Sequence, residues 1–189
     1  MTARGNRTAP GIALAFGIVF GGDLIDGVRY RHVLGHYPTG VCIVTAMEKN
    51  GVATGMVVGS FTSVSLEPPL VAILPGRRST TWPRLAAVGK FCVNVLACDQ
   101  LSLCKRFANS GDHKFAGVSH RLSSNGSPIL DGVVAWIQCD LRAVYEAGDH
   151  VIALGHVTEL EVQKPVEPLL FFRGRYGTFV SREVVEQLT

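Results

Sequence analysis

The chain has 189 residues, 47% of them hydrophobic, and its 18 basic and 15 acidic residues leave a formal net charge of only +3. This size suits one compact domain of roughly 100–200 residues, and the composition excludes a disordered chain, which combines low hydrophobicity with high net charge. No stripe of lysine or arginine stands out, which argues against nucleic acid as the main partner. Because only 17% of the residues are charged, we expect a second copy of the chain to cover part of the apolar surface.

Three helices are predicted along the chain. Apolar residues recur at helical spacing from residue 24 until Pro38 stops the pattern. A second helix opens at Ser79-Thr80-Thr81-Trp82-Pro83, where hydroxyl caps precede a proline in the first turn, and runs to about residue 88. A third has helical spacing over 99–109, and the polar, glycine- and serine-rich stretch 110–127 that follows it is expected to be loop.

Short strands make up most of the rest. Runs of β-branched and apolar residues predict strands at 40–45, 52–65, 70–74, 91–96, 133–145, 150–162 and 169–172, with the stretch 52–65 broken by Gly55 and Gly59. Many short strands, few helices and no regular alternation of the two predict a mainly β fold, an antiparallel barrel or sandwich with a few covering helices. One domain is expected over residues 23–180, between an N-terminal extension over 1–22 and a C-terminal tail over 181–189.

The N-terminal extension raises the question of targeting. Arg4 and Arg7 precede an apolar run from Ile12 to Phe20, which is typical of the first two parts of a signal peptide. Two glycines and Asp23 follow where a small-x-small cleavage site would belong. The run is also far shorter than the roughly 20 residues that span a bilayer. We therefore expect an arm without attachment to a membrane.

The chain contains five cysteines, an odd number with no close pair. They are Cys42, Cys92, Cys98, Cys104 and Cys139. This pattern is typical of free thiols in a reducing cytosol, so a cytoplasmic protein is predicted. The spacing of the middle three cysteines is not a zinc spacing, and His32 and His36, four residues apart, have no obvious third ligand. No metal site is expected.

The common catalytic motifs are missing: the chain has no phosphate-binding glycine motif, no H-E-x-x-H and no G-x-S-x-G. Arg77-Arg78-Ser79-Thr80-Thr81 lies instead between a predicted strand and a predicted helix start. Two guanidinium groups, three hydroxyls and the N–H groups of the helix start together would bind a phosphate or pyrophosphate. An ordinary helix cap with two solvated arginines explains the same residues.

Two further groups of residues invite both a functional and a structural interpretation. Gly148-Asp149-His150 begins a strand after a turn, where the imidazole either contacts a cofactor or shuttles a proton, or is a half-buried ring beside a locally bonded aspartate. Lys105-Arg106-Phe107 and Lys114-Phe115 place cations beside aromatic rings. That arrangement favours a stacked anionic ligand, and a solvated helix face explains it almost as well.

A series of motifs resembles the flavin reductase family, the short-chain NAD(P)H:flavin reductases of two-component monooxygenases. Each motif is weak alone, but their order and spacing over about residues 26–179 are specific. They are Tyr30–Leu34, Thr39-Gly40-Val41, Ser60–Leu70, Phe91–Leu96, Arg106-Phe107-Ala108, Lys114–Gly117, Ser127–Gly132, Gly148-Asp149-His150 and Pro168–Gly174.

The resemblance implies an antiparallel Greek-key split β-barrel that binds FMN, a homodimer, and hydride transfer from NADH or NADPH to FMN or FAD, with reduced flavin passed to an oxygenase component. The residues that it implies for flavin binding are Ala53, Thr54, Gly55, Met56, Val57, Gly59, Ser60, Phe61, Ser65, Pro75, Ser79, Thr80, Thr81, Arg106 and Phe107. Those that it implies for the nicotinamide side are His150, the one candidate catalytic residue, and Arg173, Gly174, Arg175 and Tyr176.

The chain departs from the family pattern where Val57 and Gly59 replace a usual hydroxyl or amide residue, which weakens flavin binding or changes the choice between FMN and FAD. Three other hypotheses stay open at this point. One is an electron carrier that holds FMN tightly on the same fold. The second is a hydrolase that uses Asp149-His150 with a serine or Cys104. The third is a dimeric structural or interaction protein.

Overall fold

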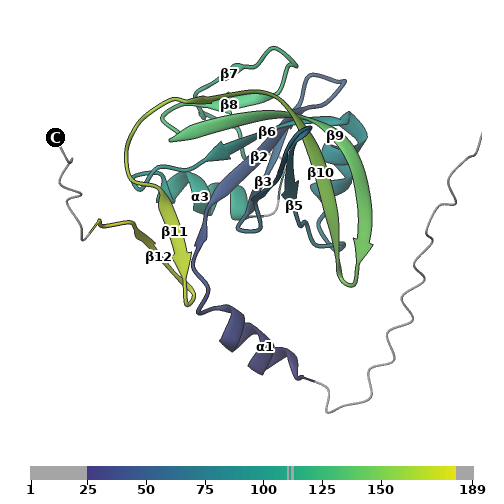
Figure 1. Cartoon of the computed structure of the whole chain (residues 1–189). Helices are drawn as coiled ribbons and strands as arrows, with labels where there is room; N and C mark the ends of the chain where they lie inside the picture. Colours follow the sequence, from purple (N-terminus) through teal and green to yellow (C-terminus); the bar gives the residue numbers. More distant parts are fainter. Residues whose placement is uncertain (1–24, 110, 112, 182–189) are drawn as a thin grey trace, which may run out of the picture.

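A computed structural model describes residues 25–109, 111 and 113–181. The predicted extension over 1–22 and the tail beyond Ser181 lie outside the described residues. The main feature is a seven-stranded antiparallel sheet with the strand order β3-β2-β6-β9-β10-β5-β4 (Figure 1). Its strands are β2 (Cys42–Met47), β3 (Ala53–Val58), β4 (Thr62–Leu66), β5 (Pro69–Ile73), β6 (Lys90–Val95), β9 (Ala135–Ala147) and β10 (His150–Val162).

The sheet is open, because its two edge strands, β3 and β4, follow one another in the chain but do not pair. The mainly β, antiparallel fold class is thereby confirmed. The strand-like stretch 52–65 is interrupted at Gly59, as predicted, because Gly59 to Phe61 connect one edge strand to the other. The second predicted break, at Gly55, is wrong, because Gly55 lies within β3. This turn is held by Ser60, whose hydroxyl accepts from the N–H of Leu74 at 3.0 Å.

Two small sheets flank the large one. One joins β1 (Thr39–Gly40), β11 (Leu169–Phe172) and β12 (Arg175–Thr178), and the other joins β7 (His120–Leu122) and β8 (Pro128–Leu130). The prediction of an uninterrupted loop over 110–127 is therefore wrong at β7. All three residues of β7 are exposed, so its sequence has no apolar alternation that would predict a strand. The strand is held by its pairing with β8.

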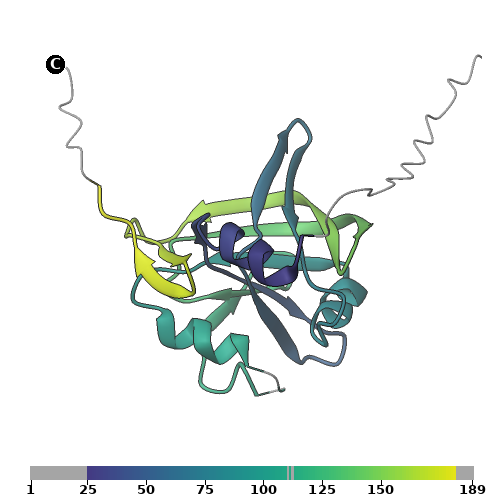
Figure 2. The ribbon, with the colours of Figure 1, turned by 90° about the horizontal axis from the view of Figure 1, so that it is seen from below.

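Three helices complete the described chain: α1 (Gly27–Leu34), α2 (Trp82–Val88) and α3 (Leu101–Ala108). Helices α2 and α3 bury Trp82 and Phe107, among others, against the sheet. Helix α1 is shorter than predicted, because the Asp26 carboxylate caps its start by accepting from two backbone N–H groups at 2.8 Å. None of its residues is buried, and it lies below the sheet, apart from it (Figures 1 and 2).

The core has two parts, one under α2 and one under α3. The first gathers residues of β2, β5, β6, β9 and β10 around Trp82 and Phe91, and the second packs Phe107 against residues of β8 and β9 such as Ile129 and Trp136. Gly155 of β10 is needed in the first part, since a Cβ there would lie 2.6 Å from Cζ of Phe91. The missing side chain at Gly155 lets the backbone of β10 lie directly against the Phe91 ring.

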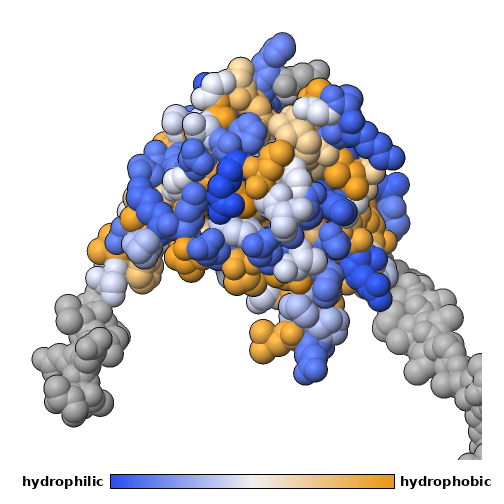
Figure 3. All heavy atoms as spheres, turned by 90° about the horizontal axis from the view of Figure 1, so that it is seen from above, coloured by the Kyte–Doolittle hydropathy of each residue, from blue (hydrophilic) through white to orange (hydrophobic). Residues whose placement is uncertain are grey.

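Among the described residues, no helix is long and apolar enough to cross a membrane. The face seen from above, opposite α1, mixes hydrophilic and hydrophobic side chains (Figure 3). The short helix α1 exposes four apolar side chains: Val28 is 72% exposed, Tyr30 57%, Val33 56% and Leu34 50%.

Candidate functional site

The edge strand β3 is the first part of the predicted flavin site. One edge of β3 pairs with β2, and its other edge is unpaired. Helix α3 approaches β3 closely at Gly55, where an added Cβ would lie 2.8 Å from Cε1 of Phe107. Phe107 itself is 1% exposed and its ring packs edge-on against that of Phe115 at 5.0 Å. The Phe107 ring therefore lies in the core, and not on a surface where it could cover a flavin.

The loop before α2 is the second part. The hydroxyl oxygen of Ser79 accepts from the N–H groups of Thr81 and Trp82 at 3.3 and 3.1 Å, so it caps the start of the helix. A serine hydroxyl can also donate, and its proton remains available. Thr80 is exposed, whereas Thr81 is buried and makes no side-chain cap. Of these three hydroxyls, Ser79 and Thr80 can reach a ligand.

These two parts meet in a small hollow lined by the start of β3 and by Thr81, Arg84, Gly111 and Lys114. Lys114 donates through Nζ to the carbonyl oxygens of Gly55 and Phe107, at 3.2 and 3.1 Å. The hollow holds about 10 Å³, room for about one water molecule. A phosphate group is larger than a water molecule and does not fit this hollow as it stands. Arg84 and Lys114 were not predicted site residues, although Lys114-Phe115 stood out as a cation beside an aromatic ring.

The other predicted flavin residues are spread along β3, β4 and the end of β5. Gly59 lies against β1, where a Cβ would come within 3.0 Å of the Thr39 hydroxyl. Pro75 is buried, and its carbonyl oxygen accepts from the N–H of Val151. The half-buried members of this set are Ala53, Met56, Val57, Ser60, Phe61 and Ser65, and the buried ones are Thr54 and Gly55.

The Arg106 side chain points away from the hollow between β3 and Thr81. Its guanidinium donates to the carbonyl oxygen of Ala116, which ties α3 to the segment that follows it. It lines a separate hollow of about 290 Å³, together with Asp131 and neighbouring residues of α3. The structure therefore does not bring Arg106 to the hollow between β3 and Thr81.

His150 lies at the turn between β9 and β10, beside the loop that carries Ser79. Residues Gly76 and His150 form a β-bridge, and the N–H of Arg77 donates to the carbonyl oxygen of Asp149 at 2.9 Å. His150 Nδ1 contacts the Asp149 carboxylate at 2.7 Å. This hydrogen bond, and then the charge of a protonated His150, hold the pKa of the exposed Asp149 below its usual value.

The hydrolase hypothesis needs a nucleophile near this pair, and the structure places Cys104 elsewhere. Cys104 is fully buried and its thiol donates to the hydroxyl of Tyr176 at 3.5 Å. That hydrogen bond and burial raise the pKa of Tyr176 to about 12. Burial likewise raises the pKa values of Cys42, Cys92 and Cys139 to about 12, so these side chains stay thiols at neutral pH. Within the described residues no three histidine, cysteine or carboxylate side chains gather to hold a metal ion.

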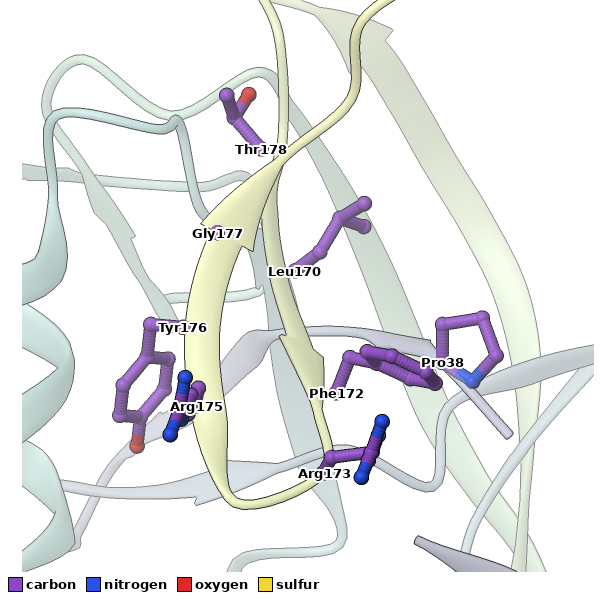
Figure 4. A pocket seen from close by; sticks show the side chains of 8 residues that line it. All are labelled: Pro38, Leu170, Phe172, Arg173, Arg175, Tyr176, Gly177 and Thr178. Atoms are coloured by element: carbon purple, nitrogen blue, oxygen red, sulfur yellow. The ribbon is translucent and has the colours of Figure 1, made fainter. Parts of the chain in front are cut away.

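The hairpin of β11 and β12 carries a hollow of about 580 Å³ (Figure 4). Three predicted nicotinamide-side residues, Arg173, Arg175 and Tyr176, line it, and Gly174 lies at the turn. Tyr176 points toward α3, whereas Phe172 lies on the opposite side of the hairpin, near Pro38. The other lining residues, which the sequence did not indicate, are Pro38, Leu170, Phe172, Gly177 and Thr178.

The two halves of the predicted nicotinamide side lie apart in one chain. The turn of β9 and β10, with His150, and the hairpin of β11 and β12 are at opposite sides of the molecule in both ribbon views (Figures 1 and 2). Instead, His150 is next to the Ser79 loop, and the hairpin is next to α1, where the N–H of Arg173 donates to the carbonyl oxygen of Gly35.

Comparison with known proteins places the chain in a family. The model of the flavin reductase like domain matches residues 34–179. A flavin reductase from Pseudomonas putida is 60% identical over 157 residues, which cover 83% of this chain and 92% of that protein. The reductase subunit of a flavin-dependent monooxygenase from Rhodococcus jostii is 46% identical over 154 residues, which cover 82% of this chain and 78% of that protein.

A solved structure extends the likeness to the fold. The NADH:FAD oxidoreductase of Streptomyces globisporus, in complex with NAD and FAD fragments, superposes with a TM-score of 0.78 at 37% identity, covering 85% of this chain and 99% of that one. The open antiparallel sheet is thus the split barrel of the flavin reductases. The chain belongs to the flavin reductase family, and the resemblance in its motifs is confirmed.

Proposed function

We propose that the protein is an NAD(P)H:flavin oxidoreductase that reduces FMN or FAD and releases the reduced flavin to a separate monooxygenase component. The observation that carries this proposal is the family match over residues 34–179, which spans every element of the large sheet. The nicotinamide and the flavin supply the hydride chemistry themselves, and the protein has to bind and orient them. A site made of hydroxyls, backbone groups and cations fits that task.

The residues of the chain fit the two cofactors as follows. The O–H of Ser79, the hydroxyl of Thr80 and the exposed guanidinium of Arg78 supply donors for a flavin phosphate. The edge strand β3, close to this loop at Thr81, offers backbone groups for the ring system. His150, beside Gly76, and the hairpin of β11 and β12 would hold the nicotinamide nucleotide. Micromolar affinity corresponds to about −8 kcal/mol, which a handful of such contacts supplies while still allowing release.

The central experiment is an anaerobic titration in which NADH or NADPH is mixed with FMN or FAD and the purified protein. We expect catalytic loss of the nicotinamide absorbance with at least one flavin. Folded protein that leaves NADH unoxidised at saturating flavin would refute the proposal. A yellow protein that keeps one flavin per chain through gel filtration would instead support the electron carrier.

A homodimer is part of this proposal, and α1 supports it. An isolated helix of eight residues is marginal in water, because helices shorter than about 12–15 residues need packing to persist. Four apolar side chains of α1 remain 50–72% exposed in the described chain. A second copy that covers α1 would bury them. The unpaired cysteines support a cytoplasmic location.

Light scattering after size exclusion tests the dimer. At micromolar concentration we expect a mass of two chains, and a Val28→Glu, Leu34→Glu variant should elute with the mass of one. Lys105→Glu, an exposed site on α3, is the matched control and should leave the dimer intact. A wild-type chain that stays monomeric under these conditions contradicts this part of the proposal.

A further inference from the structure

A positively charged hollow lies where α1 meets the turn between β11 and β12. It has a volume of about 310 Å³ and is lined by Arg31, His32, Gly35, His36, Arg173 and Gly174. Four of these six residues have cationic or protonatable side chains, and none is acidic. The backbone hydrogen bond from Arg173 to Gly35, at 2.9 Å, fixes the turn against the end of the helix.

Cations near a helix C-terminus are often explained by the carbonyl oxygens there, but in α1 those oxygens are already used. The carbonyl oxygens of residues 31–34 accept from the backbone N–H groups of residues 35–37 or, in one case, from Nδ1 of His36. The guanidinium groups of Arg31 and Arg173 make no ion pair with a described carboxylate. The hollow therefore presents positive charge and unused donors, which together select an anion with several acceptor oxygens.

This hollow adjoins the larger one on the β11–β12 hairpin. Arg173 lines both, and the ring of Phe172, which faces the larger hollow, is in edge contact with the His36 ring at a centroid distance of 6.3 Å. Aromatic and apolar side chains thus lie on one side of Arg173, and cationic side chains lie directly next to them on its other side. A ligand that joins a planar ring to a phosphate would match both hollows at once.

We infer that the hollow between α1 and the β11–β12 turn binds a phosphate group of the nicotinamide dinucleotide, with Arg31 and Arg173 as its charged partners. This inference rests on the proposed function, because it assigns a place to the hydride donor. The phosphate is either the pyrophosphate, which NADH and NADPH share, or the 2′-phosphate, which NADPH alone carries. In either case α1, which the motifs did not assign to any ligand, contributes to recognition of the donor.

The test compares Arg31→Ala and Arg173→Ala with Arg29→Ala, an exposed arginine of α1 that does not line the hollow. Equilibrium binding of NAD⁺ and NADP⁺ to flavin-free protein is measured by calorimetry, so that the readout does not depend on turnover. Losing a hydrogen bond to a charged group should weaken binding about tenfold or more in each hollow variant and leave Arg29→Ala unchanged. Inorganic pyrophosphate should compete with NAD⁺ in the wild type more strongly than in Arg31→Ala.

The pattern of losses identifies the phosphate. Equal losses for NAD⁺ and NADP⁺ assign the pyrophosphate, and a loss confined to NADP⁺ assigns the 2′-phosphate; both support the inference. Unchanged affinity of the hollow variants for both dinucleotides overturns the inference. This holds even if their flavin affinity or their mass in light scattering changes, because the arginines would then bind the flavin or contact a second chain. A wild type that binds dinucleotides but never reduces flavin refutes the proposed function and leaves the hollow's assignment standing.

Discussion

Replacing Asn94 with alanine should lower the free energy of unfolding by about 2–6 kcal/mol, because the carbonyl oxygen of Ile43 and the N–H of Leu130 lose their bonds to its amide, at about 1–3 kcal/mol each. Asn94 of β6 is fully buried. Its Nδ2 donates to the carbonyl oxygen of Ile43 and to the Thr45 hydroxyl, and its Oδ1 accepts from the N–H of Leu130 at 2.8 Å. One amide thus ties β6 to β2 and to β8, and guanidinium-induced unfolding measures what it contributes.

An Asn94→Asp variant separates the hydrogen bonds from the packing. Aspartate has nearly the shape of asparagine and keeps the acceptor for Leu130, but when ionised it cannot donate to Ile43. Burial raises the pKa of such a carboxyl, so its protonated form is favoured in the folded state and the deficit should shrink as the pH falls from 7 to 5. Asn109→Ala, at an exposed position, is the control. Asn94→Ala within about 1 kcal/mol of the wild type would contradict the assignment.

The sequence predicts those elements whose cause is local. Continuous β-branched runs such as 40–45 and 70–74 predict buried strands, and the Ser79 cap and Pro83 predict α2. The exposed strands β7 and β12 carry no such signal, because only their pairing with a neighbour makes them strands. The apolar spacing of α1 correctly indicates a helix, but spacing cannot reveal that none of its residues is buried within the described chain.

The candidate site shows the same division between local and distant causes. The Ser79 loop was predictable, because the hydroxyls and the helix start are adjacent in sequence. That Phe107 is buried depends on the absence of a side chain at Gly55, on a strand far away in the chain. Likewise, His150 comes to lie beside Gly76 only through the register between β5 and β10. Such placements follow from the assembled sheet, and no pattern within either segment encodes them.

The sharpest effect on function is expected from Ser79→Asp, which should raise the KM for FMN about 10- to 100-fold. In the proposed function Ser79 has two tasks, capping α2 and donating to the flavin phosphate, and this substitution separates them. As an acceptor it caps α2 through the N–H groups of Thr81 and Trp82, and aspartate accepts equally well at a helix start. As a donor to a phosphate it cannot be replaced by a carboxylate, which also repels the phosphate. Losing a hydrogen bond to a charged group corresponds to about 1.5–3 kcal/mol, hence the predicted range.

Riboflavin, which has no phosphate, is the matched control substrate. Its KM should be the same for Ser79→Asp and the wild type, and the melting temperature of the variant should stay within about 2 °C, since the cap is kept and a 1 kcal/mol loss in a protein of this size shifts Tm by about 2–4 °C. Ser79→Ala should lose both the cap and the donor, and so should fall in melting temperature as well as in FMN affinity. If Ser79→Asp binds FMN as tightly as the wild type, Ser79 only caps the helix, and the phosphate of the flavin has to be sought elsewhere on the barrel.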